Sequence, residues 1–173
     1  MKQAEKGFTN IELIVAITIM ALVGGAAVAA TFQIFRGTER NNDHMIAVRQ
    51  VQNAGYWISR DAQMAQSVTA DNLTPPAFLV LSWTETNSGD EYQVVYTLED
   101  MPESELKELR RTQSINGGGG ITTLVAQHIA PDLEKTKCKF TNGILTLTVT
   151  ATVGDGAPME SETRTYKLAP RSG

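Results

Sequence analysis

The residue with the most unusual chemical setting is Glu12, an acid at the start of a long uncharged segment. From Leu13 to Phe35 the chain carries no charged side chain, and its polar residues there are Thr18, Thr31 and Gln33. An unpaired ionised carboxylate that faces lipid costs on the order of a few kcal/mol on insertion scales. The sequence therefore predicts that another group compensates the charge of Glu12.

Other residue types that could do chemistry are too scattered to form a catalytic motif. His44 and His128 lie far apart in sequence, and the lone Cys138 belongs to no CxxC pair. No HExxH or GxSxG motif occurs, and Gly117–Gly120 lacks the Lys-Ser/Thr of a phosphate loop. We therefore predict no catalytic residues, no cofactor and no enzymatic activity.

Metal and nucleic-acid sites are not predicted either. The Asp90-Glu91 and Asp155-Gly156 turns could in principle hold calcium, but they lack the alternating carboxylates of an EF-hand loop. The formal charge is -4, and the basic residues are spread along the chain. Composition therefore indicates no basic face for a nucleic acid.

The element that carries Glu12 is long enough to cross a bilayer. The 23 residues from Leu13 to Phe35 span about 34 Å as a helix, close to the thickness of a hydrocarbon core. Small residues from Gly24 to Ala30 would allow neighbouring helices to approach closely in lipid. Basic residues flank both ends of the segment, so the distribution of positive charge does not decide its orientation.

The residues around Glu12 carry a resemblance to a known family. Gly7-Phe8-Thr9, followed by Ile11-Glu12 and a long apolar helix, resembles the class III signal of type IV pilins and type II secretion pseudopilins. The resemblance implies that residues 1–7 are a leader, which a prepilin peptidase removes by cleavage between Gly7 and Phe8. It also implies that the new amine of Phe8 is methylated, and that Glu12 pairs with the N-terminal amine of a neighbouring subunit. Asn10 departs from the family, which commonly has Leu at that position.

Location and partners also follow from this resemblance. The chain would cross the cytoplasmic (inner) membrane once, with its N-terminus in the cytoplasm, and would later enter an extracytoplasmic pilus or pseudopilus. Its partners would be other pilin or pseudopilin subunits, the prepilin peptidase, the inner-membrane assembly machinery and, before assembly, membrane lipid.

Two other interpretations of the N-terminus remain open. An ordinary secretory signal is supported by the small-residue pattern Ala27-Val28-Ala29, although the apolar run is longer than such signals have. A plain membrane anchor would let Glu12 reach the interface. Either one would make the chain an anchored or secreted binding protein that does not polymerise, and a secreted hydrolase would need a catalytic constellation that the sequence lacks.

Past Gly37 the helical pattern continues with a different character. Apolar residues recur at intervals of three and four, which predicts an amphipathic helix packed on a head domain; they are Ala47, Val51, Ala54, Ile58, Ala62 and Ala65. We expect a transmembrane and assembly helix over 8–36, its amphipathic second half over 37–70, and a β-rich head over 71–173. The predicted class is α+β, with a long N-terminal helix on an antiparallel sheet, as in pilins.

Strand character dominates after Pro75-Pro76. The predicted strands are Ala77–Trp83, Tyr92–Leu98, Leu109–Gln113, Lys137–Thr141, Ile144–Val153 and Glu162–Leu168. Asn142-Gly143 suits a tight hairpin turn, the connection Glu99–Lys107 could hold a helical turn, and Ile121–Ile129 fits a strand or a short helix. The order loosely resembles J-type minor pseudopilins, through Ile58-Ser59-Arg60-Asp61, Leu109-Arg110-Arg111 and the closing Leu145–Val149 hairpin.

Overall fold

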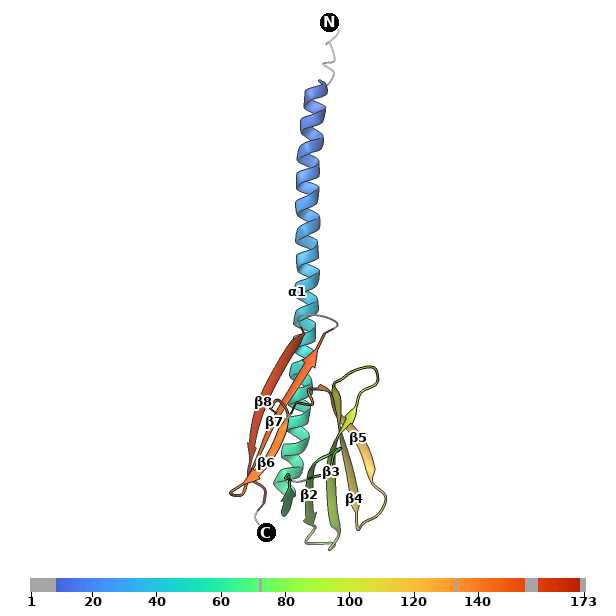
Figure 1. The fold of residues 1–173 in the computed structure, drawn as a ribbon, viewed down its shortest axis with the longest axis vertical. Helices are drawn as coiled ribbons and strands as arrows, with labels where there is room; N and C mark the ends of the chain where they lie inside the picture. Colours follow the sequence, from blue (N-terminus) through green and yellow to red (C-terminus); the bar gives the residue numbers. More distant parts are fainter. Residues whose placement is uncertain (1–8, 72, 133, 155–158, 172–173) are drawn as a thin grey trace. The chain divides into compact units, whose positions relative to one another are not determined.

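The computed structural model describes residues 9–71, 73–132, 134–154 and 159–171. A single helix, α1 (Asn10–Met64), is followed by eight strands in the described part of the chain (Figure 1). Residue contacts divide the chain into two compact units, Met1–Asn41 and Asn42–Gly173.

In the first unit the described residues belong to α1 or lie at its start, and all of them are exposed. The helix is long and apolar enough to cross a membrane. Three threonine hydroxyls donate hydrogen bonds to carbonyls four residues earlier; these pairs are Thr18–Ile14, Thr31–Ala27 and Thr38–Ile34, at 2.8–2.9 Å. These hydroxyls therefore need no water, which suits a helix in lipid.

In the second unit, α1 buries one stripe of small and aliphatic residues. All six residues of the predicted stripe are fully buried, from Ala47 to Ala65, and Gly55 and Asp61 are buried with them. The helix ends at Met64, before the end expected at residue 70. The chain turns earlier because the Gln66 side chain bonds the backbone of Thr84, and because the next residues pair with a strand.

The described residues of the second unit form an eight-stranded antiparallel sheet that curls around this part of α1 (Figure 1). The strand order is β1-β2-β3-β4-β5-β7-β6, and β8 pairs with the other edge of β7. The strands are β1 (Ser67–Thr69), β2 (Ala77–Thr84), β3 (Glu91–Asp100), β4 (Lys107–Ile115), β5 (Ile121–Ile129), β6 (Lys137–Thr141), β7 (Ile144–Val153) and β8 (Glu160–Leu168).

The α+β class is confirmed, with one long apolar N-terminal helix and an antiparallel sheet. The hairpin from β6 to β7 has the predicted bounds, and the ambiguous segment Ile121–Ile129 is a strand. The helical turn expected within Glu99–Lys107 is wrong, because β3 continues to Asp100 and a turn leads directly into β4. The short strand β1 was not predicted, since three residues are too few for a visible alternation.

A narrow link joins the two parts of the sheet. In the ladder, strand β5 pairs with β7 only at Ile129 and Ala151, next to a backbone hydrogen bond from Ala130 to Thr150, whereas β7 pairs with β8 over nine residues. Helix α1 holds both parts together, because its buried stripe lies in one core cluster with residues from β2 to β7. On the β8 side the contact is close, since the Tyr166 hydroxyl donates to the Val51 carbonyl at 3.0 Å.

This close contact yields a prediction for Gly55. A Cβ at this position would lie 2.2 Å from Cζ of Tyr166. Gly55→Ala should therefore displace the ring and reduce the free energy of unfolding by about 1–3 kcal/mol, the usual cost of overpacking. The measurement is urea unfolding of the full chain in detergent, followed by tryptophan fluorescence. Gly37→Ala is the control, because a Cβ at Gly37 would point into open space, and helix propensity alone should leave the chain equally or slightly more stable.

Candidate functional site

The first candidate site is the start of α1, where Glu12 lies. Gly7 and Phe8, the residues of the expected cleavage and methylation, are outside the described residues. Oε2 of Glu12 accepts a hydrogen bond from the Thr9 backbone N–H at 3.0 Å and another from the Thr9 hydroxyl at 3.1 Å. The Glu12 N–H in turn lies 3.4 Å from the Thr9 hydroxyl oxygen. This reciprocal arrangement is a capping box, in which Thr9 precedes the helix and Glu12 lies in its first turn.

The capping box uses only part of the capacity of the Glu12 carboxylate to accept hydrogen bonds. Both bonds from Thr9 end on Oε2, and the ion pairs of the described residues do not include Glu12. The side chain is exposed, and its apolar neighbours in sequence, such as Ile11, Leu13 and Ile14, are exposed to 56–66%. The cation that the resemblance implies for Glu12 is thus not supplied by the described part of this chain and stays a prediction.

The second unit holds a different cluster of charges, at the buried end of α1. Asp61 is 1% exposed, and Arg111 donates two hydrogen bonds to its carboxylate. Nε of Arg111 donates to Oδ2 at 2.6 Å, and Nη2 donates to Oδ1 at 3.1 Å. The Tyr96 hydroxyl donates to the same Oδ2 at 2.5 Å. The three residues come from α1, β3 and β4, so this cluster connects the helix to two adjacent strands. Burial, and next the charge of Asp61, raise the pKa of Tyr96, so its hydroxyl stays a hydrogen-bond donor.

The pairing of Asp61 with Arg111 was not predicted from the sequence, where the two residues stand out only as parts of family patterns. A usable indication existed, because Asp61 falls within the apolar stripe, three residues after Ile58 and one before Ala62. Likewise Arg111 follows Leu109 on the same face of a predicted strand. A charge in each of two apolar faces indicates a buried ion pair, since a buried charge is rarely left without a partner.

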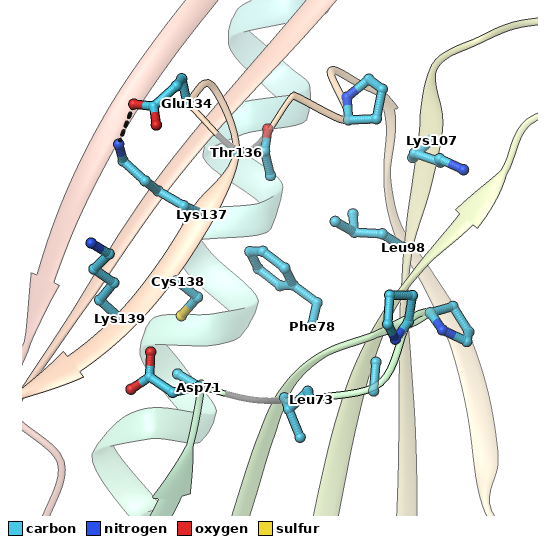
Figure 2. Close-up of a pocket in the computed structure, with 15 residues that line it drawn as sticks. Asp71, Leu73, Phe78, Leu98, Lys107, Glu134, Thr136, Lys137, Cys138 and Lys139 are labelled. Carbon is cyan, nitrogen blue, oxygen red and sulfur yellow. Dashed lines mark hydrogen bonds and ion pairs between the residues drawn. The ribbon is translucent and has the colours of Figure 1, made fainter.

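A hollow of about 520 Å³ lies between the ends of β2 and β3 and strand β6 (Figure 2). Phe78, Leu98 and Cys138 line it, and Lys137 at its rim pairs with Glu134 at 3.1 Å. Burial, and secondarily the charge of Asp71, raise the pKa of the Cys138 thiol to about 12. The thiol is therefore protonated near neutral pH and is a poor nucleophile there.

The remaining sequence candidates do not gather into a site in the described residues. His44 is exposed on α1, and His128 is half-buried on β5 with its backbone N–H 3.2 Å from the Met101 sulfur. Asp90 accepts a hydrogen bond from the Asn116 side chain at 2.7 Å and so joins the turn before β3 to the turn after β4. Asp155 and Gly156 are outside the described residues. No group of three His, Cys, Asp or Glu residues suited to a metal ion occurs where the structure is described.

No protein-family model, curated protein or solved structure matches the chain.

The buried cluster yields a second prediction. Arg111→Met leaves Asp61 as a buried carboxylate without its main partner and should reduce the free energy of unfolding by about 3–5 kcal/mol. Adding Asp61→Leu to that variant should recover most of the loss, because no charge of this pair is then left buried without its partner. Urea unfolding of the full chain measures both variants.

Arg110 on the same strand provides the control for that experiment. Its side chain is 39% exposed and pairs with Glu99 and Glu108. Arg110→Met should therefore cost only about 0–1 kcal/mol, as surface pairs usually do. Equal losses from Arg110→Met and Arg111→Met would contradict the assignment of Asp61 and Arg111 as the pair that fastens the helix.

Proposed function

We propose that this chain is a structural subunit, of the minor kind, of a type IV pilus or type II secretion pseudopilus. Its leader, residues 1–7, is removed by a prepilin peptidase, and the new amine of Phe8 is methylated. The mature chain is held in the cytoplasmic membrane with its N-terminus inside. It then assembles through its N-terminal helix into an extracytoplasmic filament, with the inner-membrane assembly machinery and other subunits as its partners.

The observation that carries this proposal is a carboxylate at the start of the exposed apolar segment of α1. Glu12 begins a segment in which every described residue up to Asn42 is exposed, and of its two carboxylate oxygens only Oε2 is engaged by Thr9. In lipid this arrangement is costly, because the capping box supplies hydrogen bonds but no positive charge. A subunit's N-terminal amine placed against Glu12 would supply the charge and would favour helices docked in one register.

The exposed apolar surface supports the same proposal. It includes Phe32, Ile34 and Phe35, each exposed to more than 60%. Such a surface is stable in lipid before assembly, and after assembly it needs other helices to cover it. Gly24 and Gly25, which have open space where a Cβ would lie, leave room for close helix contacts.

A membrane-anchored or secreted binding protein that does not polymerise is the competing hypothesis. It shares the apolar helix and the β-rich head, but it gives Glu12 no role beyond beginning the helix. The two hypotheses therefore differ in what happens at Gly7 and at Glu12.

Processing provides the first test. The intact mass of the chain recovered from membranes should correspond to cleavage after Gly7 with one added methyl group. Gly7→Ala should leave the leader attached, because the peptidase would no longer recognise the bond. An uncut wild-type chain would support the anchored binding protein, and cleavage after Ala29 or Ala30 would support a secreted protein.

The charge of Glu12 provides the second test. Glu12→Gln keeps a side chain that can complete the capping box, but it removes the negative charge. We expect normal cleavage and a loss of incorporation into filaments of about tenfold or more, since about 1.4 kcal/mol of lost pairing is a factor of ten. Incorporation is measured as the fraction of the chain in sheared filaments, in a system that requires this protein.

Two further variants separate charge from capping. Thr9→Val removes the capping hydroxyl and should reduce incorporation less than Glu12→Gln does. Glu39→Gln removes a carboxylate from the same helix, beyond the apolar run, and should leave incorporation unchanged. If Glu12→Gln assembles as well as Glu39→Gln, the proposed role of the Glu12 charge is wrong.

A further inference from the structure

A groove with a mixed aromatic and cationic lining lies on the inner face of the sheet, next to the end of α1. It consists of two hollows, of about 450 Å³ and about 210 Å³, and both are lined by Arg111 and Gln113. We call these two hollows together the end groove. The larger hollow also contacts Arg60 and Met64 in the last turns of α1.

Apolar side chains from adjacent strands form one row along this groove. Trp83 pairs with Tyr92, and Tyr92 pairs with Ile115 across β2, β3 and β4. The rings of Trp83 and Tyr92 are stacked, with centroids 5.4 Å apart. Ile115 is 44% exposed. Ile121 lies on β5, opposite Gln113 of β4, and is 76% exposed. Trp83 is buried and Tyr92 is half-buried, so the core face of the sheet is left uncovered at Ile115 and Ile121.

Positive charge exceeds negative charge in the lining. Three guanidinium groups line the larger hollow, those of Arg60, Arg111 and Arg171, against the carboxylates of Asp61 and Glu85. Both carboxylates already have partners, because Asp61 is held by Arg111, and Glu85 accepts from the Tyr92 hydroxyl at 3.3 Å.

Arg60 is the guanidinium best placed for a ligand. It is 48% exposed, lies over the Trp57 ring at 4.5 Å, and comes no closer to Asp61 than 3.8 Å. Arginine and aromatic residues together are the composition enriched at protein interfaces, and an exposed guanidinium binds carboxylates with two parallel hydrogen bonds.

The opposite end of the same strands carries the complementary charge. The turn between β3 and β4 includes residues 102–105, all exposed, which we call the acidic tip. Its carboxylates, Glu103 and Glu105, make no ion pair among the described residues, whereas the flanking Asp100 pairs with Lys107. The acidic tip is therefore an exposed anionic turn of this chain.

We infer that the acidic tip of one copy of this chain binds in the end groove of a second copy. Glu103 and Glu105 would meet Arg60 and Arg171 of that copy, while its exposed Ile121 would be covered. The inference rests on the proposed function, since it supplies a contact between heads in a filament. The partner is a second copy because the chain itself carries both complementary surfaces.

The positions of the two surfaces determine what such a contact builds. They lie at opposite ends of β3 and β4, and β3 has ten residues, which corresponds to about 33 Å of extended strand. The proposed function orients all copies in the same direction, which excludes an antiparallel two-fold pair. A contact between opposite ends of parallel copies is heterologous, and it repeats as an open file when its rotation does not close a ring. Such a file is the arrangement that a filament requires.

Site-specific disulfide formation between two differently tagged full-length copies tests the inference. One copy carries Ser104→Cys in the acidic tip, and the other carries Ile121→Cys in the end groove. Under mild oxidation in membranes we expect a disulfide between the copies. Both copies also carry Cys138→Ser, so that the engineered cysteine is the only thiol in each. The matched control replaces Ile121→Cys by Lys167→Cys, an exposed position on β8, and should give only the background seen when one of the two engineered cysteines is absent.

Charge reversal makes the test specific. Glu103→Arg together with Glu105→Arg in the first copy should lower the yield of the disulfide by about tenfold, in line with coupling energies at charged interfaces. Arg60→Glu in the second copy should restore a large part of the yield. Circular dichroism of each variant checks that the fold is unchanged.

The outcomes separate the inference from the proposed function. A yield no higher than the Lys167→Cys control, a yield insensitive to charge reversal, or a disulfide only with a different protein overturns the contact. If cleavage after Gly7 and incorporation persist in those same samples, the filament proposal stands without it. If cleavage and incorporation are absent in the wild type, the filament proposal itself is wrong, whatever the disulfide yield.

Discussion

The structure of the head depends on the burial of one narrow stripe of α1 against the sheet. The stripe consists largely of small residues, such as Ala47, Ala54 and Ala62, so strands approach the helix closely. At Gly55 the approach is closest, because the ring of Tyr166 occupies the place of a side chain. Since β5 and β7 form only one ladder pair, the two groups of strands are also joined through the core that both share with the helix.

Asp61 fixes the position of the helix along that apolar contact. Apolar packing alone tolerates small shifts along a helix, whereas a buried carboxylate must meet its hydrogen-bond partners or lose several kcal/mol. Tyr96 and Arg111 come from adjacent strands and meet the same Asp61 oxygen. The cluster therefore sets where the helix lies on the sheet, and it leaves one side of Arg111 as part of the end groove.

The two units of the chain need different surroundings. In the second unit, the sheet buries α1, whereas in the first unit the same helix exposes large apolar side chains over more than twenty residues. In the proposed function, the partner of the exposed segment must be apolar along most of its length and positive at one point. A neighbouring subunit with a free amine meets both requirements, which is why the proposed function follows from Glu12 more than from the head.

Sequence alone determined the elements whose pattern is local. The apolar run, the stripe from Ala47 to Ala65 and the β6–β7 hairpin were predictable, because helix periodicity, strand alternation and an Asn-Gly turn act over a few residues. Glu12 stands out for the same reason, since one charge in an uncharged run is visible without a fold, and its role stays a prediction.

Tertiary structure decided what depends on distant residues. The end of α1 at Met64 is set by pairing of the next residues with β2, and the strand state of Ile121–Ile129 is set by pairing with β4. The meeting of Asp61 with Arg111, 50 residues apart, depends on how the sheet curls. The end groove is likewise absent from any local pattern, because its row of side chains is created by the register of four strands.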